Sequence, residues 1–514
     1  MRTSKLCKSG IMLLVAVALR CVEVAAQDQI TFTWHATGEK IIYKTQATNA
    51  EEFYVNWGDG SAIDTETGLG YDGGAYTNVQ LTHNYAEEGE YTVTISAGEN
   101  CRFYYFDCSG FYNSETSTIV NNQISSLQIT DCNELEQLYC YYNQLTTLDV
   151  STCSSLWLVY CSENLLTSVT CSPAVQRFYC HVNQLSDLDL STYTELTMLM
   201  CSHNQLTELN LNSCPNLQAL SCDYNQLSTI DISSCPNLQE FCCNFNLLQT
   251  LDVSNSQNLQ TFICNNNQIH TLNTSGCTSL HILSCGNNVL TELDLTDYTS
   301  LTEVSCTGNE LSALNINGCS SSLRVYCNEN KLQLSDLFEI SELIDDANNK
   351  WLGTQYISTT ADTGDELFAD QSVFSDIFTN YSVNPDGYHT VVEGKLIFNA
   401  AGDYTVVMTN DAIIAYPDFS TQVIAEITVN SGVNINSHSL SDMLLFPNPT
   451  HDYFMIDPTG VATVKLYDML GKEVLSQNAN GKTEINISHL PNGMYSVQII
   501  SAERIVANSK ILKY

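Results

Sequence analysis

The chain has 514 residues, with 57 Asp and Glu against 18 Lys and Arg, and a formal net charge of −39. That charge excludes a nucleic-acid backbone or an anionic membrane surface as a plausible partner, because both would be repelled. With 44% hydrophobic and only 15% charged residues, the composition is that of a folded protein. The length suits roughly three to five domains.

Residues 1–26 have the pattern of an export signal. Basic residues at the start precede an apolar run from Ile11 to Leu19, and Val24-Ala25-Ala26 forms a small-residue cleavage site. This apolar run is too short for a membrane-spanning helix, which needs about 20 residues. We therefore expect a signal peptide, and an exported mature protein that is not membrane-spanning.

Residues 27–100 alternate apolar and polar side chains as β-strands do. The string Trp57-Gly58-Asp59-Gly60-Ser61 suits a tight turn, and Gly89-Glu90-Tyr91-Thr92-Val93-Thr94 alternates like a strand. Together with His83-Asn84-Tyr85, these segments resemble the PKD-like domain. The resemblance implies a small β-sandwich without enzymatic activity, in which Asp59 is a hydrogen-bonding turn residue and not a catalyst.

One asparagine per unit marks an internal repeat between residues 122 and 330, with a step of 21 residues and a single step of 19. These residues are Asn122, Asn143, Asn164, Asn183, Asn204, Asn225, Asn246, Asn267, Asn288, Asn309 and Asn330. A cysteine stands three residues before each of the last ten: Cys140, Cys161, Cys180, Cys201, Cys222, Cys243, Cys264, Cys285, Cys306 and Cys327.

The unit reads LxxLxCxxNxLxxLDLSxCxx and resembles the leucine-rich repeat, with Cys in the slot of the third Leu. The resemblance implies a mainly β fold: a solenoid of 21-residue coils with a parallel sheet, flanked by β-sandwich domains. In the xLxCx segment alternate residues face opposite sides, so Leu and Cys enter the core while their neighbours line the concave sheet. We expect each Asn to cap backbone groups, stacking into a ladder.

The boundaries of the solenoid follow from where the repeat fades. Residues 101–121, rich in Tyr and Phe, would cover the first coil as an N-terminal cap, and residues 122–354 would hold the solenoid with its C-terminal cap. We interpret residues 355–430 as an immunoglobulin-like module, with strands at 402–408 and 423–429. Residues 431–443 would form a polar linker.

The ladder cysteines have two interpretations. Neighbouring positions, about 4.8 Å apart, are close enough for disulfides by Cα distance, but parallel strands aim their Cβ vectors side by side. We favour buried free thiols that act as small hydrophobes over disulfides or metal ligation. Cys101 and Cys108, before the regular array, are better disulfide candidates.

Residues 444–514 carry a different set of motifs. Phe446-Pro447-Asn448-Pro449 is followed by the strings VKLYDMLGKEV and LPNGMYSV. This order resembles the C-terminal sorting domain of type IX secretion. The resemblance implies recognition by the type IX secretion machinery and removal on secretion, often with attachment to surface lipopolysaccharide. The protein would be secreted or attached to the outer surface of a Gram-negative bacterium.

The outward strand positions form the candidate binding face. Rigid aromatic rings with polar edges give contact area for protein or sugar recognition at little entropy cost, although tyrosine also simply stiffens sheets. The predicted ligand-binding residues are Tyr139, Tyr141, Tyr142, Tyr160, Tyr179, His181, Met200, His203 and Tyr224. We interpret His181 and His203 as surface histidines and not as a metal site, because no further ligands are placed beside them.

A second outward ladder is mainly acidic and consists of Asp149, Asp189, Asp231, Asp252 and Asp294, with Asn210, Asn273 and Asn315 interspersed. Stacked like charges repel one another, so Ca²⁺ would stabilise such an edge. We favour a solvated edge without metal, because the neutral residues already dilute the charge.

No GxSxG, HExxH, P-loop or dinucleotide motif occurs in a suitable context, so we expect neither catalysis nor a cofactor. The sequence predicts a surface binding or adhesion protein that recognises a host or neighbouring-cell protein or glycan. The alternatives are a glycan-capture component for nutrient uptake and, less favoured, a surface hydrolase.

Overall fold

The computed structural model describes residues 27–72, 75–113, 118–254, 256–417, 420–431, 450–456, 461–469, 471–501 and 504–514. The expected signal peptide, the expected linker after Ser431 and the segment Phe446–Pro449 lie outside these ranges. The chain divides into two compact units at the bond between Cys327 and Asn328, and each unit is described by itself. None of the helices in these ranges is long and apolar enough to cross a membrane.

The first unit begins with an antiparallel sheet. Strand β1 (Gln29–Ala47) pairs with β6 (Val79–Ala97), which also pairs with β2 (Glu52–Asn56), and β2 pairs with β3 (Asp64–Thr67). Two further short strands, β4 (Tyr71–Asp72) and β5 (Ala75–Tyr76), form a hairpin. Large side chains that alternate along these strands, including Phe32, Trp34 and Phe53, are fully buried and form the core.

The turn after β2 has the geometry predicted for the Trp57 to Ser61 string. Gly58 and Gly60 have φ angles of +79° and +83°, in the left-handed region that glycine adopts most easily. Asp59 accepts a hydrogen bond from the Ser61 N–H at 3.0 Å, and its other oxygen lies 2.8 Å from His83 Nε2. The prediction that Asp59 is a turn residue is confirmed.

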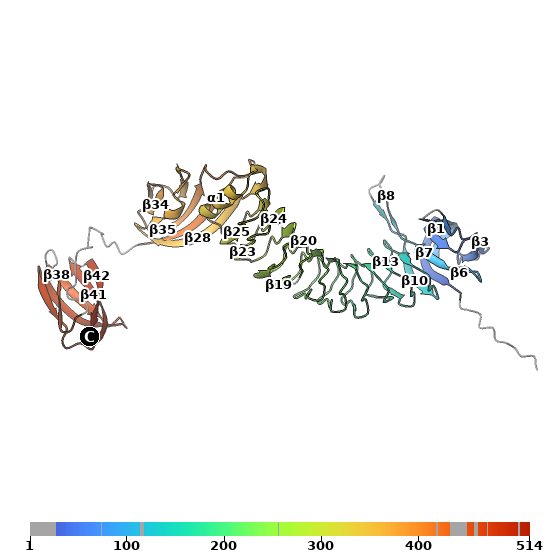
Figure 1. Ribbon diagram of the computed structural model, residues 1–514, viewed down its shortest axis with the longest axis horizontal. Helices are drawn as coiled ribbons and strands as arrows, with labels where there is room; N and C mark the ends of the chain where they lie inside the picture. Colours follow the sequence, from blue (N-terminus) through green and yellow to red (C-terminus); the bar gives the residue numbers. More distant parts are fainter. Residues whose placement is uncertain are drawn as a thin grey trace, which may run out of the picture. The chain divides into compact units, whose positions relative to one another are not determined.

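Strand β7 (Phe103–Asp107) belongs to two sheets. It pairs antiparallel with the end of β1 and parallel with the first solenoid strand, β11 (Gln137–Tyr139). Strand β10 (Ile124–Thr130) pairs with the other half of β1, so the N-terminal sheet continues directly into the solenoid. A hairpin of β8 (Phe111–Asn113) and β9 (Thr118–Val120) follows β7 (Figure 1).

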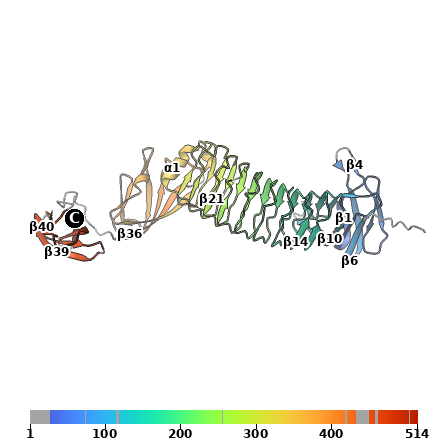
Figure 2. The same cartoon turned by 60° about the horizontal axis from the view of Figure 1, so that its bottom comes forward.

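The solenoid consists of stacked coils, each of which adds one short strand to a parallel sheet (Figures 1 and 2). Pairing is in register from coil to coil, because each coil repeats the same 21 positions, apart from the single 19-residue step. After β11 the strands are β13 (Leu158–Tyr160), β15 (Arg177–Tyr179), β16 (Met198–Met200), β17 (Ala219–Ser221), β18 (Glu240–Cys242), β20 (Thr261–Ile263), β22 (Ile282–Ser284), β24 (Glu303–Ser305) and β26 (Arg324–Tyr326). The predicted fold class, a mainly β protein built on a leucine-rich repeat solenoid, is confirmed.

A second set of short strands forms three separate two-stranded parallel sheets along the solenoid. The pairs are β12 (Thr147–Val150) with β14 (Ser168–Cys171), β19 (Thr250–Asp252) with β21 (Thr271–Asn273), and β23 (Glu292–Asp294) with β25 (Ala313–Asn315).

The ladder cysteines point into the core. All ten have an exposed fraction of 0%, and the structure contains them as free thiols. Burial raises the pKa of Cys161, Cys201, Cys285 and Cys327 to about 12, so these thiols stay neutral and behave as small apolar groups. The preference for buried thiols over disulfides is confirmed.

Cys101 and Cys108, the better disulfide candidates in the sequence, do not form a disulfide with each other. Both thiols are free and buried, and they lie on either side of β7. An extended strand advances about 3.3 Å per residue, so it separates the two cysteines by far more than the roughly 7 Å limit for a disulfide.

The asparagine ladder ties neighbouring coils together. In Asn143, Nδ2 donates to the carbonyl oxygens of Cys140 in its own coil and Cys108 before it, while Oδ1 accepts from the Ile124 N–H at 3.0 Å. The same three-way pattern recurs at Asn164, Asn183, Asn204, Asn225, Asn246, Asn267, Asn288 and Asn309. The predicted capping role is confirmed, and each amide serves two coils.

The second unit starts with helix α1 (Leu334–Leu343), whose apolar side is buried, then η1 (Ala347–Asn349) and β27 (Lys350–Trp351). Lys350 Nζ donates to the Ser341 carbonyl at 2.6 Å and so satisfies a carbonyl near the C-terminal end of the helix.

A four-stranded sheet follows in the order β28 (Thr354–Asp362), β36 (Gln422–Asn430), β35 (Gly402–Thr409) and β32 (Asn380–Asn384), and the predicted strands at 402–408 and 423–429 are confirmed. The smaller elements are β29 (Glu366–Leu367), η2 (Ala369–Gln371), β30 (Val373–Phe374), β31 (Ile377–Phe378), β33 (His389–Val392) and β34 (Lys395–Phe398).

The end of the chain forms a set of antiparallel strands with its own core. These strands are β37 (Tyr453–Ile456), β38 (Val461–Tyr467), β39 (Glu473–Asn480), β40 (Thr483–Asn486), β41 (Gly493–Ser501) and β42 (Arg504–Lys513). Phe454, Val464, Leu466 and Ile511 are among the fully buried residues of that core. Lys513 Nζ lies within 2.6–2.9 Å of the carbonyl oxygens of Ile487, Ser488 and Leu490, which fixes the last strand to the 487–490 turn.

Candidate functional site

Aromatic side chains meet on the outward face of the first strands of the main parallel sheet. The Tyr139 ring lies 5.1 Å from Tyr105 of β7 and 6.0 Å from Tyr160, and Tyr160 stacks on Tyr179 at 4.8 Å. Register explains this row, because Tyr139, Tyr160 and Tyr179 are direct partners in the parallel pairing.

A second row widens the aromatic surface at the turn after each strand. The Tyr141 ring lies 4.7 Å from Tyr160 and 5.5 Å from Tyr142, and the His181 ring lies 5.8 Å from Tyr160. We call the group formed by Tyr105, Tyr139, Tyr141, Tyr142, Tyr160, Tyr179 and His181 the strand-face cluster. All but Tyr105 were predicted from the sequence, and the structure brings them together.

The border of the cluster adds a cation and two thioethers. The guanidinium of Arg177, on the same face as Tyr179, lies 5.8 Å from the centre of the Trp157 ring. Tyr179 O–H donates to Met198 Sδ at 2.9 Å, and the half-buried Met200 follows in the same coil. Tyr, Trp, Arg and Met are the residues enriched where proteins bind one another.

The cluster presents neutral groups at physiological pH. Its tyrosines and His181 are half-buried. Burial raises the pKa of Tyr139, Tyr141 and Tyr160, and burial followed by the charge of His203 lowers the pKa of His181. The phenol and imidazole groups therefore offer hydrogen bonds without charge.

The other half of the same face is polar and internally hydrogen-bonded. Asp223 Oδ1 accepts from the Asn244 N–H at 2.6 Å, Asn244 Oδ1 accepts from the Asn265 N–H at 2.8 Å, and Asn265 Oδ1 accepts from the Gly286 N–H at 2.6 Å. Because these side-chain oxygens already accept hydrogen bonds from backbone N–H groups of the next coil, that half offers a ligand few free hydrogen-bond acceptors. The binding candidates therefore concentrate on the N-terminal coils.

His203 and Tyr224 do not belong to the strand-face cluster. His203 stacks on Tyr224 at 4.2 Å, and Tyr224 stacks on Phe245 at 4.2 Å. These three residues occupy the turn just before the ladder asparagine, where φ is +55°, +52° and +53°. The predicted residue set is thus divided between two surfaces.

The acidic ladder has a structural role. Oδ1 of Asp149, Asp189, Asp231, Asp252 and Asp294 accepts from the backbone N–H two residues later, at 2.9–3.0 Å. Asn210, Asn273 and Asn315 make the same turn bond. Among the residues that the structure describes, no group of three or more His, Cys, Asp or Glu is placed to hold a metal ion.

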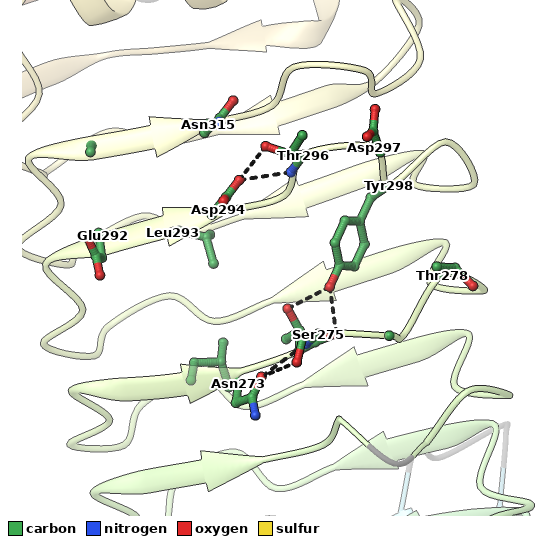
Figure 3. A pocket seen from close by; sticks show the side chains of 14 residues that line it. Asn273, Ser275, Thr278, Glu292, Leu293, Asp294, Thr296, Asp297, Tyr298 and Asn315 are labelled. Atoms are coloured by element: carbon green, nitrogen blue, oxygen red, sulfur yellow. Dashed lines mark hydrogen bonds between the residues drawn. The ribbon is translucent and has the colours of Figure 1, made fainter.

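A hollow of about 730 Å³ opens between β21 and β23, which belong to two of the short parallel sheets (Figure 3). Tyr298 occupies a slot filled by Cys277 one coil earlier, and its O–H donates to the Thr274 carbonyl at 2.5 Å. The Tyr298 ring reaches from its own coil to the preceding one. In the described chain, β21 and β23 belong to different sheets. The facing Asp294 and Asn273 are engaged in their own turn bonds.

Sequence reasoning missed one member of the strand-face cluster, Tyr105, and two residues at its border, Trp157 and Arg177. Tyr105 lies in the expected cap, outside the Cys and Asn register, so only the pairing of β7 with β11 reveals its position. Arg177 is one of only two Lys or Arg residues between residues 122 and 330. Its position two residues before Tyr179 could have placed it on the same outward face of the strand.

A family model for the secretion system C-terminal sorting domain matches residues 444–513. The end of the chain is a secretion sorting domain. This agrees with the separate core of its strands, and it indicates export, with secretion or display on the outer surface. No curated protein matches the chain.

Several solved structures of repeat proteins are similar to the chain. The functional domain of InlJ from Listeria monocytogenes, which includes a cysteine ladder, is 18% identical over 63% of this chain and 90% of that one, with a TM-score of 0.34. The leucine-rich effector YopM from Yersinia pestis is 25% identical, with coverages of 39% and 56% and a TM-score of 0.34. The chain thus spans little more than half of YopM. These scores are too low to transfer a function.

Proposed function

We propose that the chain is a secreted or surface-displayed binding protein that recognises a protein or glycan through the strand-face cluster. The observation that carries this proposal is the continuous contact of aromatic rings from four successive strands, β7, β11, β13 and β15. Rings fixed by their neighbours lose little conformational freedom on binding, and their hydroxyl edges give directional contacts. The role is adhesion or recognition, without catalysis.

The proposed organisation serves that role. A signal peptide at 1–26 and the sorting domain would deliver the chain through type IX secretion. A PKD-like domain at 27–100, a cap at 101–121 and an immunoglobulin-like module at 355–430 would flank the binding solenoid at 122–354. Host or neighbouring-cell proteins and glycans are the ligand classes that an exported aromatic surface would meet.

The test compares capture of ligands by the wild-type chain and a variant with Tyr139→Ser, Tyr160→Ser and Tyr179→Ser on arrays of matrix proteins and glycans. The variant should lose about tenfold or more in affinity for any captured ligand, because the contact surface is lost. A control with Thr261→Ala and Ser305→Ala, on the polar half of the same face, should bind normally. Unaltered capture by a folded triple-serine variant would refute the proposal.

A further inference from the structure

One turn residue in each coil of the solenoid has a left-handed backbone conformation, with φ between +52° and +70°. The residues in this slot are Tyr142, Glu163, Val182, His203, Tyr224, Phe245, Asn266, Asn287, Gly308 and Glu329. Asparagine and glycine adopt this conformation readily, whereas β-branched and bulky side chains are disfavoured there. Three successive coils use the favoured residues Asn266, Asn287 and Gly308, but the three coils before them carry aromatic rings.

Burial does not explain these aromatic rings. Tyr224 and Phe245 are 43% and 41% exposed, and Leu247, two residues further along, is 47% exposed. The rings stack in sequence with interplanar angles of 12° and 13°. Stacking offsets part of the backbone strain, but asparagine in the same slot would need no such compensation. We call His203, Tyr224, Phe245 and Leu247 the turn ridge.

The electrostatic surroundings of the turn ridge are negative. Glu163 occupies the same slot two coils before His203, and the charge of that histidine acts on its carboxyl. Arg177 and Arg324 are the only Lys or Arg residues between 122 and 330, in a chain of net charge −39. Such a field attracts a cationic partner and repels an acidic one.

The stacked geometry limits what the turn ridge can bind. Sugar rings pack flat against open aromatic faces, but here the faces of Tyr224 are covered by His203 and Phe245. What remains open are ring edges, the outer faces of the end rings and the Leu247 side chain, which suit aliphatic groups and the flat guanidinium of arginine.

We propose that the turn ridge is a second binding surface that docks a cationic protein segment, with Tyr224, Phe245 and Leu247 as the apolar contact and Glu163 as the charged one. Its apolar contacts lie outside the strand-face cluster, and the proposal does not depend on that cluster binding anything. It also accounts for why these coils keep strained aromatic residues where asparagine would fold more easily.

The probe is a short peptide of alternating arginine and leucine, titrated into the full chain by calorimetry, with an alternating glutamate and leucine peptide for comparison. The arginine peptide should bind, and the variant with Tyr224→Asn and Phe245→Asn should bind it about tenfold or more weakly. Because neither substitution changes charge, general attraction to an acidic protein cannot produce that difference. The melting temperature of this variant should stay the same or rise.

Three further measurements sharpen the test. Val289→Asn removes a side chain that is 40% exposed but lies outside the turn ridge, and it should leave binding unchanged. Glu163→Gln should weaken binding several-fold at low salt. The triple-serine variant of the strand-face cluster should bind the arginine peptide normally. Equal binding of the two peptides, or normal binding of the arginine peptide by the double asparagine variant, would overturn the proposal. If that variant bound normally but melted at a lower temperature, the aromatic stack would serve only the fold.

Discussion

The side-chain amide of Asn164 bridges two coils, because its Nδ2 donates to the carbonyl oxygen of Cys140, 2.9 Å away in the preceding coil. The same nitrogen lies 3.1 Å from the Cys161 carbonyl in its own coil. One asparagine therefore satisfies the backbone on both sides of each boundary, and the strict Asn register of the sequence has a direct physical cause.

Asn267→Ala should destabilise the solenoid by about 2–4 kcal/mol. The substitution removes donations to the carbonyls of Cys243 and Cys264 and leaves the Leu248 N–H, which Asn267 Oδ1 accepts at 3.1 Å, without its partner. Chemical denaturation followed by circular dichroism measures the loss. Asn258→Ala is the matched control, because the exposed Asn258 makes a single bond to the Pro236 carbonyl and should cost under about 1 kcal/mol. Equal losses in the two variants would contradict the ladder.

Alkaline pH should unfold the solenoid steeply. Burial raises the pKa of Cys161, Cys201, Cys285 and Cys327 from 9.0 to about 12. Below pH 9 the thiols are neutral in the folded and in the unfolded chain, and their contribution to stability is complete. As the pH rises from 9 through 12 that contribution is lost, because only the unfolded chain ionises. Each of these thiols should lower the free energy of unfolding by about 1.4 kcal/mol for every pH unit between pH 9 and pH 12. A melting temperature that stays flat from pH 8 to pH 11 would contradict the buried ladder.

Thiol reagents should distinguish the few accessible cysteines from the buried ones. Cys242 and Cys319 are half-buried, while the other cysteines of the described chain are buried. At pH 8 the folded protein should react slowly and only at these two positions, since burial raises the pKa of Cys242 to about 11. Mass spectrometry after labelling identifies the modified sites, and denaturant should release all of them. Rapid labelling of Cys201 or Cys222 in the folded chain would show that the ladder faces solvent.

Asp231→Asn should leave stability at neutral pH within about 0.5 kcal/mol of wild type, because asparagine makes the same turn bond at Asn210 and Asn273. Asp231→Ala removes the acceptor for the Ser233 N–H and should destabilise the fold by up to about 1 kcal/mol. The melting temperature should not respond to added calcium. A calcium-dependent rise that Asp231→Asn abolishes would instead establish an ion site on this edge.

The sequence predicted the solenoid well because every coil repeats the same requirements. The inward Cys, the capping Asn and the turn Asp each recur at one position of the repeat, so the role predicted for that position in one coil applies to the other coils. Cys101 and Cys108 have no such register, and their separation by β7 appears only in the structure. The antiparallel pairing of β10 with β1 was also missed, because the first repeat asparagine, Asn122, placed that segment in the solenoid.

The binding candidates were predicted only in part for a similar reason. Outward positions follow from alternation, which placed Tyr139, Tyr160 and Tyr179 on one face. The turn after each strand ends that alternation with a left-handed residue. In this slot His203 and Tyr224 stack with Phe245 instead of with the strand tyrosines, whereas Tyr142 contacts Tyr141. Turn conformation depends on one φ angle, which a hydrophobic pattern does not reveal.

The most direct test of the strand-face cluster is hydroxyl-radical footprinting of the exported chain, alone and with a ligand captured from the arrays. The proposal predicts protection of Tyr139, Tyr160 and Tyr179, with no protection of the hollow around Tyr298. Unprotected tyrosines in a saturated complex, with protection elsewhere on the chain, would contradict it.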